Sequence, residues 1–380
     1  MILNGNDPIA IAQAAQALLR GELLGLPTET VYGLAADAGN DGAVKAIFHT
    51  KGRPSDHPLI VHVAHAQGAQ HFASEVPEFA QRLMDAFWPG PLTLILPRQT
   101  QVAALAAGGQ DSVGLRCPAH PVAQAVLQAA EGLGVRGVAA PSANRFGRVS
   151  PTTAAHVAAE LGDDLLIVDG GACEVGIEST IIDCTRGQPV LLRPGVLTPA
   201  ELSAACGLTV RLPTQEADAD APRASGTLAS HYAPSARVCL LPLAQLQQAL
   251  QVEAKAIAQG LGQAQRLGQA IGQVQRQGQG QLEGLAHAPA PTQHTTADAP
   301  NTTHWVVWTR SLSGPDASWP AGVRWVNMPN DPAQCAHELF AQLRAFDDAG
   351  ITHIWVESPP PAPEWAGVLD RLSRAASPDR

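Results

Sequence analysis

The sequence predicts an α/β protein with two domains, and three observations lead to this prediction. Short apolar runs typical of buried strands alternate with stretches of helical period along most of the chain. Several of these apolar runs end in polar turns, and ligands usually bind at such strand ends in α/β sheets. The composition shifts near residue 210, and a chain of 380 residues is long enough for two or three domains.

The composition shift predicts a first domain at 1–208, a linker at 209–236 and a smaller α/β domain at 237–380. Within the linker, residues 213–226 are acidic and rich in Pro and Ala, as is typical of an interdomain connection. Residues 257–303 are rich in Gln, Gly, Ala and Pro, with a loose Gly-Gln repeat. A segment of this composition buries little apolar surface, so we predict a disordered insertion there.

The helices are predicted from capping residues followed by an apolar pattern of helical period. The first spans 7–20, because Asp7 is a good N-cap and Pro8 fits the first helical position. Thr152 or Thr153 is the candidate cap of a helix that extends to about residue 161. The remaining helices are predicted at 41–49, 77–86, 121–130, 243–256, 332–349 and 364–375.

The strands are predicted from short apolar runs bounded by turn residues. In the first domain they lie at 23–26, 59–63, 92–96, 113–116, 137–140, 165–169, 179–183 and 190–193. The last two are expected to pair as a hairpin, because Gly187 and Pro189 lie in the turn between them. In the second domain the strands lie at 237–241, 305–308, 323–326 and 353–356.

Composition and charge exclude several classes of protein. No apolar run approaches the roughly 20 residues needed to cross a bilayer, and the first residues lack the features of a secretory signal. Six cysteines occur without any Cys-x-x-Cys pair, which argues against a zinc site and a disulfide framework. A formal charge of −10 argues against broad nucleic-acid binding but permits a local cationic pocket. We therefore expect a cytoplasmic protein.

The stretch from Pro27 to His62 is the most informative part of the chain. A polar block at 27–34 follows the first predicted strand, and Lys51-Gly52-Arg53-Pro54 precedes the second. Lysine is scarce, since only Lys45, Lys51 and Lys255 occur. A lone lysine beside an arginine, on a loop expected not to be helical, indicates a bound polyanion. The alternative is a solvated basic turn, and this stretch alone does not decide between the two.

Other predicted strand ends carry small hydroxyl groups or single cations. A nucleoside triphosphate site needs cations for phosphates, hydroxyl and backbone donors for oxygen atoms, and usually Mg²⁺. Ser and Thr also cap turns in many proteins, so each of these residues alone is open to a purely structural interpretation. The set comprises Thr28, Thr30, Ser112, Arg116, Ser142, Asn144, Ser150, Ser179, Thr180 and Arg193.

Common nucleotide and hydrolase motifs are absent from the sequence. It contains no Walker A pattern, no Gly-x-Gly-x-x-Gly after a predicted strand and no Gly-x-Ser-x-Gly elbow. These absences argue against a P-loop ATPase, a dinucleotide-dependent dehydrogenase and a serine hydrolase. His62 and His65 lie three residues apart, but a zinc site would need a third ligand nearby. We expect His62 to face the pocket and His65 to lie on the surface.

Six stretches in order resemble the threonylcarbamoyl-AMP synthase family, the YrdC-like proteins, in its long two-domain form. The Ser230-His231-Tyr232-Ala233-Pro234 segment and the α/β domain after it resemble the linker and second domain of that form. The matching stretches are 27–34, 51–62, 112–116, 140–144 with 150–152, 178–183, and 192–195. The resemblance implies a YrdC-like twisted mixed sheet with flanking helices, plus a smaller C-terminal Rossmann-like α/β domain.

The resemblance also implies a nucleotidyltransferase reaction, in which L-threonine, bicarbonate or CO₂, and ATP give threonylcarbamoyl-AMP and pyrophosphate. A partner tRNA threonylcarbamoyltransferase complex would then modify adenosine 37 of tRNAs that read codons beginning with A. Mg²⁺ would be held through the phosphates rather than by protein side chains, and no redox cofactor is implied. A weak contact with tRNA is a further candidate interaction, and no membrane partner is implied.

The matching positions carry the implied binding roles. Lys51 and Arg53 are the implied catalytic residues. Threonine would be bound by Thr30, His62, Arg116, Ala140 and Ser179. ATP would be bound by Lys51, Arg53, His57, Ser112, Ser142, Ser150, Arg193 and Tyr232. Tyr232 would close over the nucleotide, which would make the linker a lid. The family commonly has asparagine where this chain has His57, so the contact at that position is open.

Two other functions remain as alternatives. A non-catalytic RNA-binding module could use a concave cationic surface, but the acidic total charge and the lack of aromatic stacking platforms argue against it. A carbamoyltransferase of the hydrogenase-maturation type contains a related domain, but it also carries cysteine-rich zinc fingers that this sequence lacks.

Overall fold

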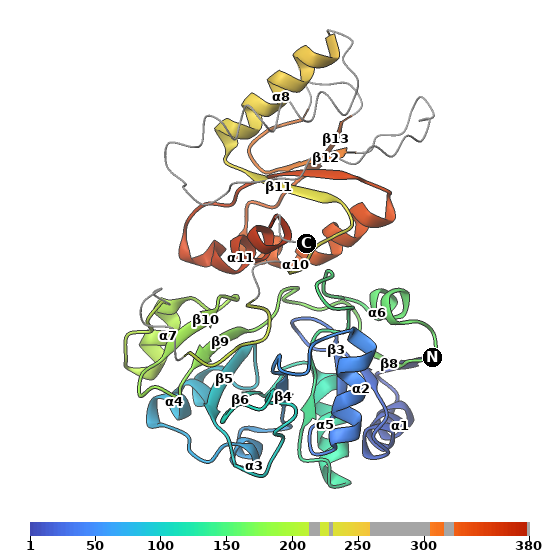
Figure 1. Ribbon diagram of the computed structural model, residues 1–380, viewed down its shortest axis with the longest axis vertical. Coiled ribbons are helices and arrows are strands. Elements are labelled where there is room, and N and C mark those ends of the chain that lie inside the picture. Colours follow the sequence, from blue (N-terminus) through green and yellow to red (C-terminus); the bar gives the residue numbers. More distant parts are fainter. Residues whose placement is uncertain (213–220, 228–230, 259–304, 315–322, 378–380) are drawn as a thin grey trace.

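The computed structural model describes residues 1–212, 221–227, 231–258, 305–314 and 323–377 (Figure 1). It has two α/β domains, which confirms the predicted fold class. The predicted insertion at 257–303 lies outside the described residues except for its first two positions, as does the linker segment 213–220. None of the described helices is both long enough and apolar enough to cross a membrane.

The first domain contains a ten-stranded mixed sheet in the order β1-β8-β2-β3-β7-β4-β6-β5-β9-β10. Its strands are β1 (Ile2–Asn4), β2 (Leu24–Leu26), β3 (Gly33–Asp37), β4 (Ile60–His62), β5 (Leu92–Pro97), β6 (Ser112–Arg116), β7 (Val138–Ala139), β8 (Leu166–Asp169), β9 (Thr180–Asp183) and β10 (Val190–Arg193). The β9–β10 pair is antiparallel, which confirms the predicted hairpin.

The helices of the first domain lie on both faces of this sheet. They are α1 (Pro8–Leu19), α2 (Asp41–Lys51), α3 (Ala69–Phe72), α4 (Glu78–Phe87), α5 (Pro121–Gly132), α6 (Ala154–Leu161) and α7 (Pro199–Cys206). Alternate residues of a strand face opposite sides of a sheet. Accordingly Ala35 packs in the core with α1 and α5, whereas Leu34 and Ala36 pack in the core with α2 and α4.

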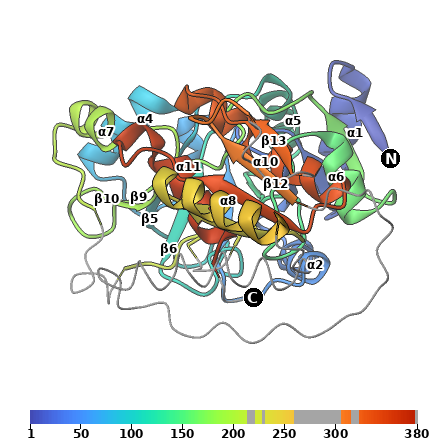
Figure 2. The same ribbon diagram turned by 90° about the horizontal axis from the view of Figure 1, so that it is seen from above.

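The second domain has a four-stranded sheet in the order β11-β14-β12-β13, in which every pair is parallel. Its elements are β11 (Arg237–Leu241), α8 (Leu243–Ala258), β12 (Trp305–Thr309), β13 (Arg324–Asn327), α10 (Pro332–Asp348), β14 (His353–Glu357) and α11 (Ala366–Ala375). Helix α8 lies across one face of the sheet (Figure 2). Helices α10 and α11 lie on the other face, between this sheet and the first domain (Figure 1).

The two domains meet through an apolar core that includes residues from both. Val31, Val149 and Ile177 of the first domain belong to the same buried cluster as Leu339 and Phe340 of α10. An apolar interface of this kind favours a fixed arrangement of the domains over a loose tether.

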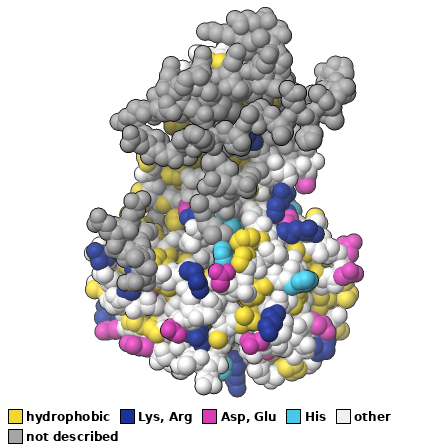
Figure 3. Space-filling view, viewed as in Figure 1, with side chains coloured by type: hydrophobic (Ala, Val, Ile, Leu, Met, Phe, Trp, Pro, Cys, Tyr) yellow, Lys and Arg dark blue, Asp and Glu magenta, His cyan; other side chains and the backbone are white. Residues whose placement is uncertain are grey.

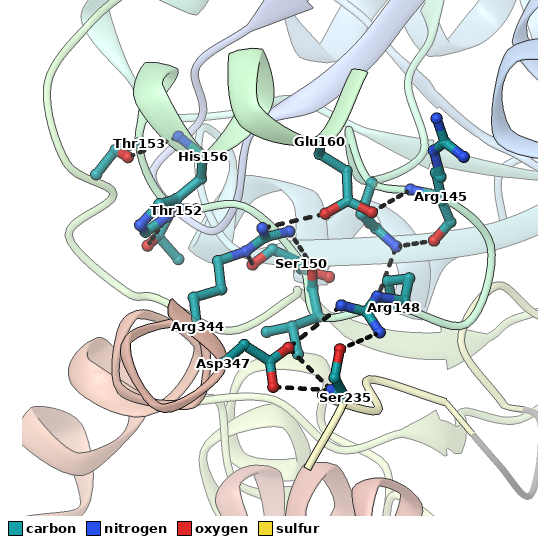
Figure 4. A network of polar contacts seen from close by, with 12 residues as sticks. Arg145, Arg148, Ser150, Thr152, Thr153, His156, Glu160, Ser235, Arg344 and Asp347 are labelled. Atoms are coloured by element: carbon teal, nitrogen blue, oxygen red, sulfur yellow. Dashed lines mark hydrogen bonds and ion pairs between the residues drawn. The ribbon is translucent and has the colours of Figure 1, made fainter. Parts of the chain in front are cut away.

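Polar contacts surround this core where α10 meets the segment before α6 (Figure 4). Arg344 of α10 pairs with Glu160 at 3.1 Å and donates to the backbone carbonyl groups of Val149 and Ser150. One turn further along α10, Asp347 pairs with Arg148 at 3.2 Å and accepts the backbone N–H of Ser235 at 2.8 Å. These contacts hold the end of the linker against both domains.

Close backbone approach at the interface predicts a measurable effect of Gly176→Ala. Gly176 has φ +79°, and a Cβ atom there would lie 2.5 Å from the Cα atom of His337 in α10. We expect this variant to lower the thermal unfolding midpoint, because both the backbone conformation and the contact become unfavourable, at a cost of about 2 kcal/mol or more.

The matched control for that variant is Gly187→Ala. Gly187 has φ +73° but nothing within 4 Å of an added Cβ, so it carries the conformational cost without the contact. Scanning calorimetry of both variants separates the two effects. Equal shifts in the two midpoints would show that the α10 contact contributes nothing.

The structure differs from the sequence-based prediction at several elements. Residues 33–37 form β3, although a polar turn is predicted for the block at 27–34. The short strand β1 and the helices α3 and α7 are absent from the prediction, and α7 begins with a capping box between Thr198 and Glu201. The prediction of a loop at Lys51 is wrong, because Lys51 is the last residue of α2, which ends where Gly52 adopts φ +63°.

Candidate active site

The site is built on one face of strands β4, β5 and β6, opposite the face that packs against α2 and α4. In β4, β6 and β5, alternate residues such as Val61, Leu115 and Leu94 pack in the core with α2 and α4. The residues between them face the other way, and two adjoining cavities are found on that side. The side chains that line these cavities from β4, β5 and β6 are Ile60, His62, Thr93, Ile95, Ser112 and Arg116.

The larger cavity, of about 570 Å³, brings together residues from separated parts of the chain. It contains ten of the predicted site residues, including all four predicted cations. These are Thr30, Lys51, Arg53, His62, Arg116, Ala140, Ser142, Ser179, Arg193 and Tyr232. A local cationic pocket therefore exists within a protein whose formal charge is −10.

Lys51 lines this cavity and is only 3% exposed. Its Nζ atom donates to the backbone carbonyl oxygen of Ser142 at 2.6 Å and to that of Asn144. Burial, with a further contribution from Arg53, holds the pKa of the Lys51 ammonium well below its ordinary value. Its place at the C-terminal end of α2 favours the charged form through the helix dipole.

Arg53 and Arg193 both line the larger cavity and both contact Ser225 in the linker. Arg193 Nη1 donates to the backbone carbonyl of Ser225 at 2.9 Å, and Arg53 Nη2 lies 3.4 Å from the Ser225 hydroxyl. Arg193 also donates to the carbonyl of Ser179 at 2.9 Å. Burial lowers the pKa of Arg53 to about 10 and also lowers that of Arg193. Both guanidinium groups stay protonated at neutral pH.

Arg116 is held by a buried carboxylate behind the cavity wall. Its Nη2 atom lies 2.7 Å from Glu29 Oε1, and its Nη1 donates to the Thr30 hydroxyl at 2.7 Å. Both charged side chains are almost completely buried. Although burial opposes its ionisation, the charge of Arg116 lowers the pKa of Glu29. The pair therefore presents a fixed guanidinium next to Thr30.

Two histidines in the cavity wall are neutral. His62, at the end of β4, and His231, in the linker, are both buried, and burial lowers the pKa of each to about 3. The Nδ1 atoms of both rings have no hydrogen-bond partner among the described residues, so they can contact a ligand as neutral groups. His65 lies at the surface beside Glu131, as expected.

Tyr232 closes the cavity from the linker side. It is 1% exposed, stacks on Phe340 of α10 with ring centroids 5.3 Å apart, and adopts φ +60°. Its hydroxyl group has no hydrogen-bond partner among the described residues, and burial raises its pKa to about 12. A buried hydroxyl without a partner is costly, so its position in the cavity lining indicates a ligand contact.

The smaller cavity, of about 280 Å³, lies between the sheet and the linker. Ser112 lines it, together with Gly114 and Ile181 from the sheet and the linker residue Arg223. Gln110 fixes this part of the linker, since its side-chain amide exchanges two hydrogen bonds with the backbone of Arg223, at 2.7 and 3.2 Å.

Two predicted ATP contacts lie outside the lining of both cavities. His57 packs edge-on against Phe146, with ring centroids 5.5 Å apart. Ser150 is fully buried, and its hydroxyl donates to Glu178 Oε1 at 2.5 Å. Ser150 therefore contacts Glu178, and His57 contacts Phe146. Both of these partners line the larger cavity.

Glu178 is a site residue that reasoning from the sequence did not single out. It lines the larger cavity and is the only acid to do so among the described residues. Although burial opposes its ionisation, Arg371 and Arg193 hold the pKa of Glu178 below its ordinary value. The sequence did contain one signal for Glu178. This acid directly precedes the predicted buried strand at 179–183, and a buried carboxylate needs a cationic partner.

No group of three or more His, Cys, Asp or Glu side chains suitable for a metal ion occurs in the part of the chain that the structure describes. The cations around the larger cavity suit anionic oxygen atoms instead. Glu178, the acid in this lining, already pairs with Arg371 and accepts a hydrogen bond from Ser150.

Comparisons with known proteins cover both domains. Residues 16–195 match a family model described as Telomere recombination, that of the Sua5, YciO and YrdC proteins. Residues 197–377 match a model described as the threonylcarbamoyl-AMP synthase C-terminal domain. The threonylcarbamoyl-AMP synthase of Schizosaccharomyces pombe is 31% identical over 402 aligned residues, which cover 97% of this chain and 88% of the relative. The chain belongs to the threonylcarbamoyl-AMP synthase family.

Other members agree with this assignment. The threonylcarbamoyl-AMP synthase of Pyrococcus abyssi is 45% identical over 230 residues, which cover 60% of this chain and 66% of that protein. A crystal structure of P. abyssi Sua5 complexed with L-threonine has a TM-score of 0.76 and 32% identity, with 99% of this chain and 97% of that chain covered. The predicted family and the enzyme class of threonylcarbamoyl-AMP synthases are confirmed.

The unpartnered hydroxyl of Tyr232 leads to a prediction for this family member. Tyr232→Phe should lower activity by about threefold to tenfold, because a single hydrogen bond to a ligand is lost. Tyr232→Ala should lower it much further, because the stacking on Phe340 and the closure of the cavity are lost as well. Deletion of residues 226–236 should have the largest effect of the three.

Steady-state rates of pyrophosphate release measure all three variants. Circular dichroism of each variant gives the control for folding. If all three variants kept nearly the full rate of pyrophosphate release, the linker would not act as a lid.

Proposed function

We propose that this chain condenses L-threonine, bicarbonate or CO₂, and ATP into threonylcarbamoyl-AMP and pyrophosphate. The observation that supports this most directly is the convergence of Lys51, Arg53, Arg116 and Arg193 on one cavity. A site for one anion would not need four buried cations, whereas a triphosphate beside an amino-acid carboxylate would use them all.

Threonine fits the part of the larger cavity at the ends of β4 and β6. Arg116, held by Glu29, would form a bidentate contact with its carboxylate. Thr30, Ser179 and the backbone at Ala140 offer hydrogen-bond groups for the amino and hydroxyl groups. His62, neutral at physiological pH, can accept or donate without repelling the amine. The likeness of this chain to P. abyssi Sua5, which was crystallised as a complex with L-threonine, supports threonine as the amino-acid substrate.

ATP fits across both cavities. Its phosphates would lie among Lys51, Arg53 and Arg193, with Ser142 as a further donor. Its adenosine would extend toward the smaller cavity, where Ser112 and the linker backbone at Arg223 offer polar contacts. His57 and Ser150 do not line either cavity and would act on ATP indirectly. His57 would act through its contact with Phe146, and Ser150 through its hydrogen bond with Glu178. Tyr232 would close over the nucleotide.

The chemistry requires positioning and charge stabilisation more than a covalent intermediate. The neutral amine of threonine attacks CO₂ and loses a proton, which gives a carbamate. A carbamate oxygen then bonds to the α-phosphorus of ATP as the bond from that phosphorus to the bridging oxygen breaks, and pyrophosphate leaves. The fixed cations would stabilise the charge that builds up on the leaving group, and a closed cavity would protect the labile product from water.

The product of this reaction would be used in tRNA modification. A separate tRNA threonylcarbamoyltransferase complex would move the threonylcarbamoyl group to adenosine 37 of tRNAs that read codons beginning with A. We propose a cytoplasmic location, where ATP and these tRNAs are found together.

Direct RNA binding is not favoured by the visible surface. On the face shown in Figure 3, Lys and Arg side chains are interspersed with Asp and Glu over the first domain, without a continuous basic patch. A filter-binding assay with tRNA at increasing salt tests this point. Tight binding with a steep salt dependence would support a contact with tRNA beyond a weak one.

The test of the proposed reaction is pyrophosphate release with ATP, threonine and bicarbonate, with each substrate omitted in turn. We expect release only with all three, and a product with the mass of threonylcarbamoyl-AMP. Release without threonine would indicate ATP hydrolysis instead. Consumption of carbamoyl phosphate in place of bicarbonate would favour the carbamoyltransferase alternative.

Mg²⁺ is proposed to arrive with ATP. We expect EDTA to abolish pyrophosphate release and excess Mg²⁺ to restore it fully, because the metal is bound to phosphate oxygens and no protein site has to be refilled. Threonine binding, measured by calorimetry without nucleotide, should be unchanged by EDTA. Loss of threonine binding in EDTA would point to a protein-bound metal.

A further inference from the structure

Arg371 belongs to the second domain, yet its side chain ends beside the active site of the first. It lies in α11, near the C-terminal end of the described residues, and is fully buried. An arginine buried to this extent requires several specific partners. The proposed reaction assigns no direct part to Arg371.

The contacts of Arg371 connect three segments that surround the cavity. Its Nε atom donates to Glu178 Oε2 at 3.0 Å, and its Nη2 donates to the backbone carbonyl of Glu178 at 3.2 Å. Its Nη1 donates to the carbonyl of Pro194, directly after Arg193, at 2.6 Å. Its guanidinium carbon lies 5.4 Å from the centroid of the Tyr232 ring.

Backbone packing holds α11 close enough for these contacts. A Cβ atom at Gly367, one turn before Arg371, would lie 2.7 Å from the carbonyl oxygen of Gly195. The helix is therefore in direct contact with the loop after β10, and Arg371 is not free to move away from Glu178.

Charged and titratable groups face Glu178 from every side. Arg193 comes from β10, Lys51 from α2, and His231 and Tyr232 from the linker, with Arg371 and Asp370 on α11. Ser150 donates the remaining hydrogen bond. Without Arg371, the cations nearest to Glu178 would be Arg193 and Lys51, which are the groups assigned to the phosphates of ATP.

We propose that Arg371 is a positioning residue for the nucleotide site, which neutralises Glu178 and thereby leaves Lys51 and Arg193 available to bind ATP. The inference rests on the proposed function and gives the second domain a part in it. The active site of the first domain would be electrostatically complete only when α11 is docked.

Removal of one partner from a buried ion pair leaves the other charge uncompensated. In Arg371→Met, Glu178 would draw Lys51 and Arg193 toward itself and repel the triphosphate. Burial would then dominate, so the pKa of Glu178 would rise above its value in the wild type. As the pH falls through that raised pKa, Glu178 becomes protonated and neutral, and ATP binding should recover.

The experiment compares KM for ATP in Arg371→Met with that of the wild type between about pH 5.5 and about pH 8.5, a range on both sides of neutrality. We expect a KM increase of about tenfold or more at about pH 8, with kcat changed by less than about threefold. The ratio of the variant KM to the wild-type KM should fall at acid pH. This ratio cancels the titration of ATP itself.

Glu178→Gln in the Arg371→Met background supplies the rescue. Since the uncompensated charge is then absent, we expect KM for ATP to return to within about threefold of the wild type and to lose its extra pH dependence. The matched control is Arg148→Met, because Arg148 also forms an ion pair across the domain interface, with Asp347, but lines neither cavity. This control should leave KM for ATP unchanged.

Three outcomes would overturn the inference: an unchanged KM in Arg371→Met, a raised KM ratio that is independent of pH, or no rescue by Glu178→Gln. If Arg371→Met does not fold, Arg371→Lys keeps the charge but cannot reach Glu178 and Pro194 together, and it should show a smaller KM increase with the same pH trend. An unchanged KM in that variant also overturns the inference. Failure of the wild type to make threonylcarbamoyl-AMP would instead refute the proposed function.

Discussion

Lys51→Ala is expected to reduce pyrophosphate release by about a thousandfold, which lies within the range for removal of a cationic side chain that stabilises phosphoryl transfer. Lys51 is the one lysine among the described residues of the cavity, and its Nζ atom is fixed by the carbonyl groups of Ser142 and Asn144. The reaction would lose the ammonium group that is proposed to contact the phosphates. Both kcat and kcat/KM for ATP should fall.

The fold should survive this substitution. Two hydrogen bonds are lost, but so is an ammonium group whose charged form is disfavoured by burial, and we expect the thermal unfolding midpoint to change by less than about 4 °C. Lys45→Ala is the matched control, because Lys45 lies on the exposed face of the same helix. Near-full activity in Lys51→Ala would exclude Lys51 from the catalytic site.

Arg116→Ala is expected to abolish threonine-dependent activity, with a loss of about a thousandfold, because the proposed bidentate contact with the threonine carboxylate would disappear. It should also destabilise the protein by about 3–5 kcal/mol, because Glu29 is left as a buried charge without its partner. Calorimetric titration with threonine and thermal unfolding measure the two effects separately.

The pH dependence of stability distinguishes the effect of an uncompensated Glu29 charge in this variant from the effect of lost packing alone. In the wild type the pKa of Glu29 is lowered, so the pair stabilises the fold above the unfolded-state pKa of Glu and loses this contribution as the pH falls. In Arg116→Ala the pKa of Glu29 should be raised, so the variant should lose stability as the pH rises. Adding Glu29→Gln should restore stability without restoring activity. Restored threonine binding in that double variant would contradict the assigned role of Arg116.

Much of the fold could be predicted from the sequence, because each strand of the first sheet that ends at the site is a short apolar run before a polar residue. Lys51 stood out by its rarity, and Arg116 and Arg193 stood out because each follows an apolar strand. The structure brings all three to one cavity. Strand β3 was missed because Gly33-Leu34-Ala35-Ala36 begins inside a polar block and contains few β-branched or aromatic residues.

Residues at the domain interface could not be predicted in the same way. Glu178 and Arg371 are 193 positions apart, and neither lies in a pattern that relates one to the other. Their pairing depends on the docking of α11 against the loop after β10, which follows from the tertiary packing of Gly367 on Gly195. Ser150 was assigned to ATP from its position in a motif, whereas its observed partner is Glu178.

The contacts of Ser225 have a consequence for substrate exchange. Its carbonyl oxygen and hydroxyl group occupy hydrogen-bond positions on Arg193 and Arg53, the two guanidinium groups assigned to the nucleotide. A triphosphate that takes these positions must replace one set of oxygen atoms with another, so only the difference between the two sets contributes to affinity. The same exchange in reverse would help pyrophosphate to leave. The linker would then compete with the nucleotide for the two arginines, and so influence both substrate binding and product release.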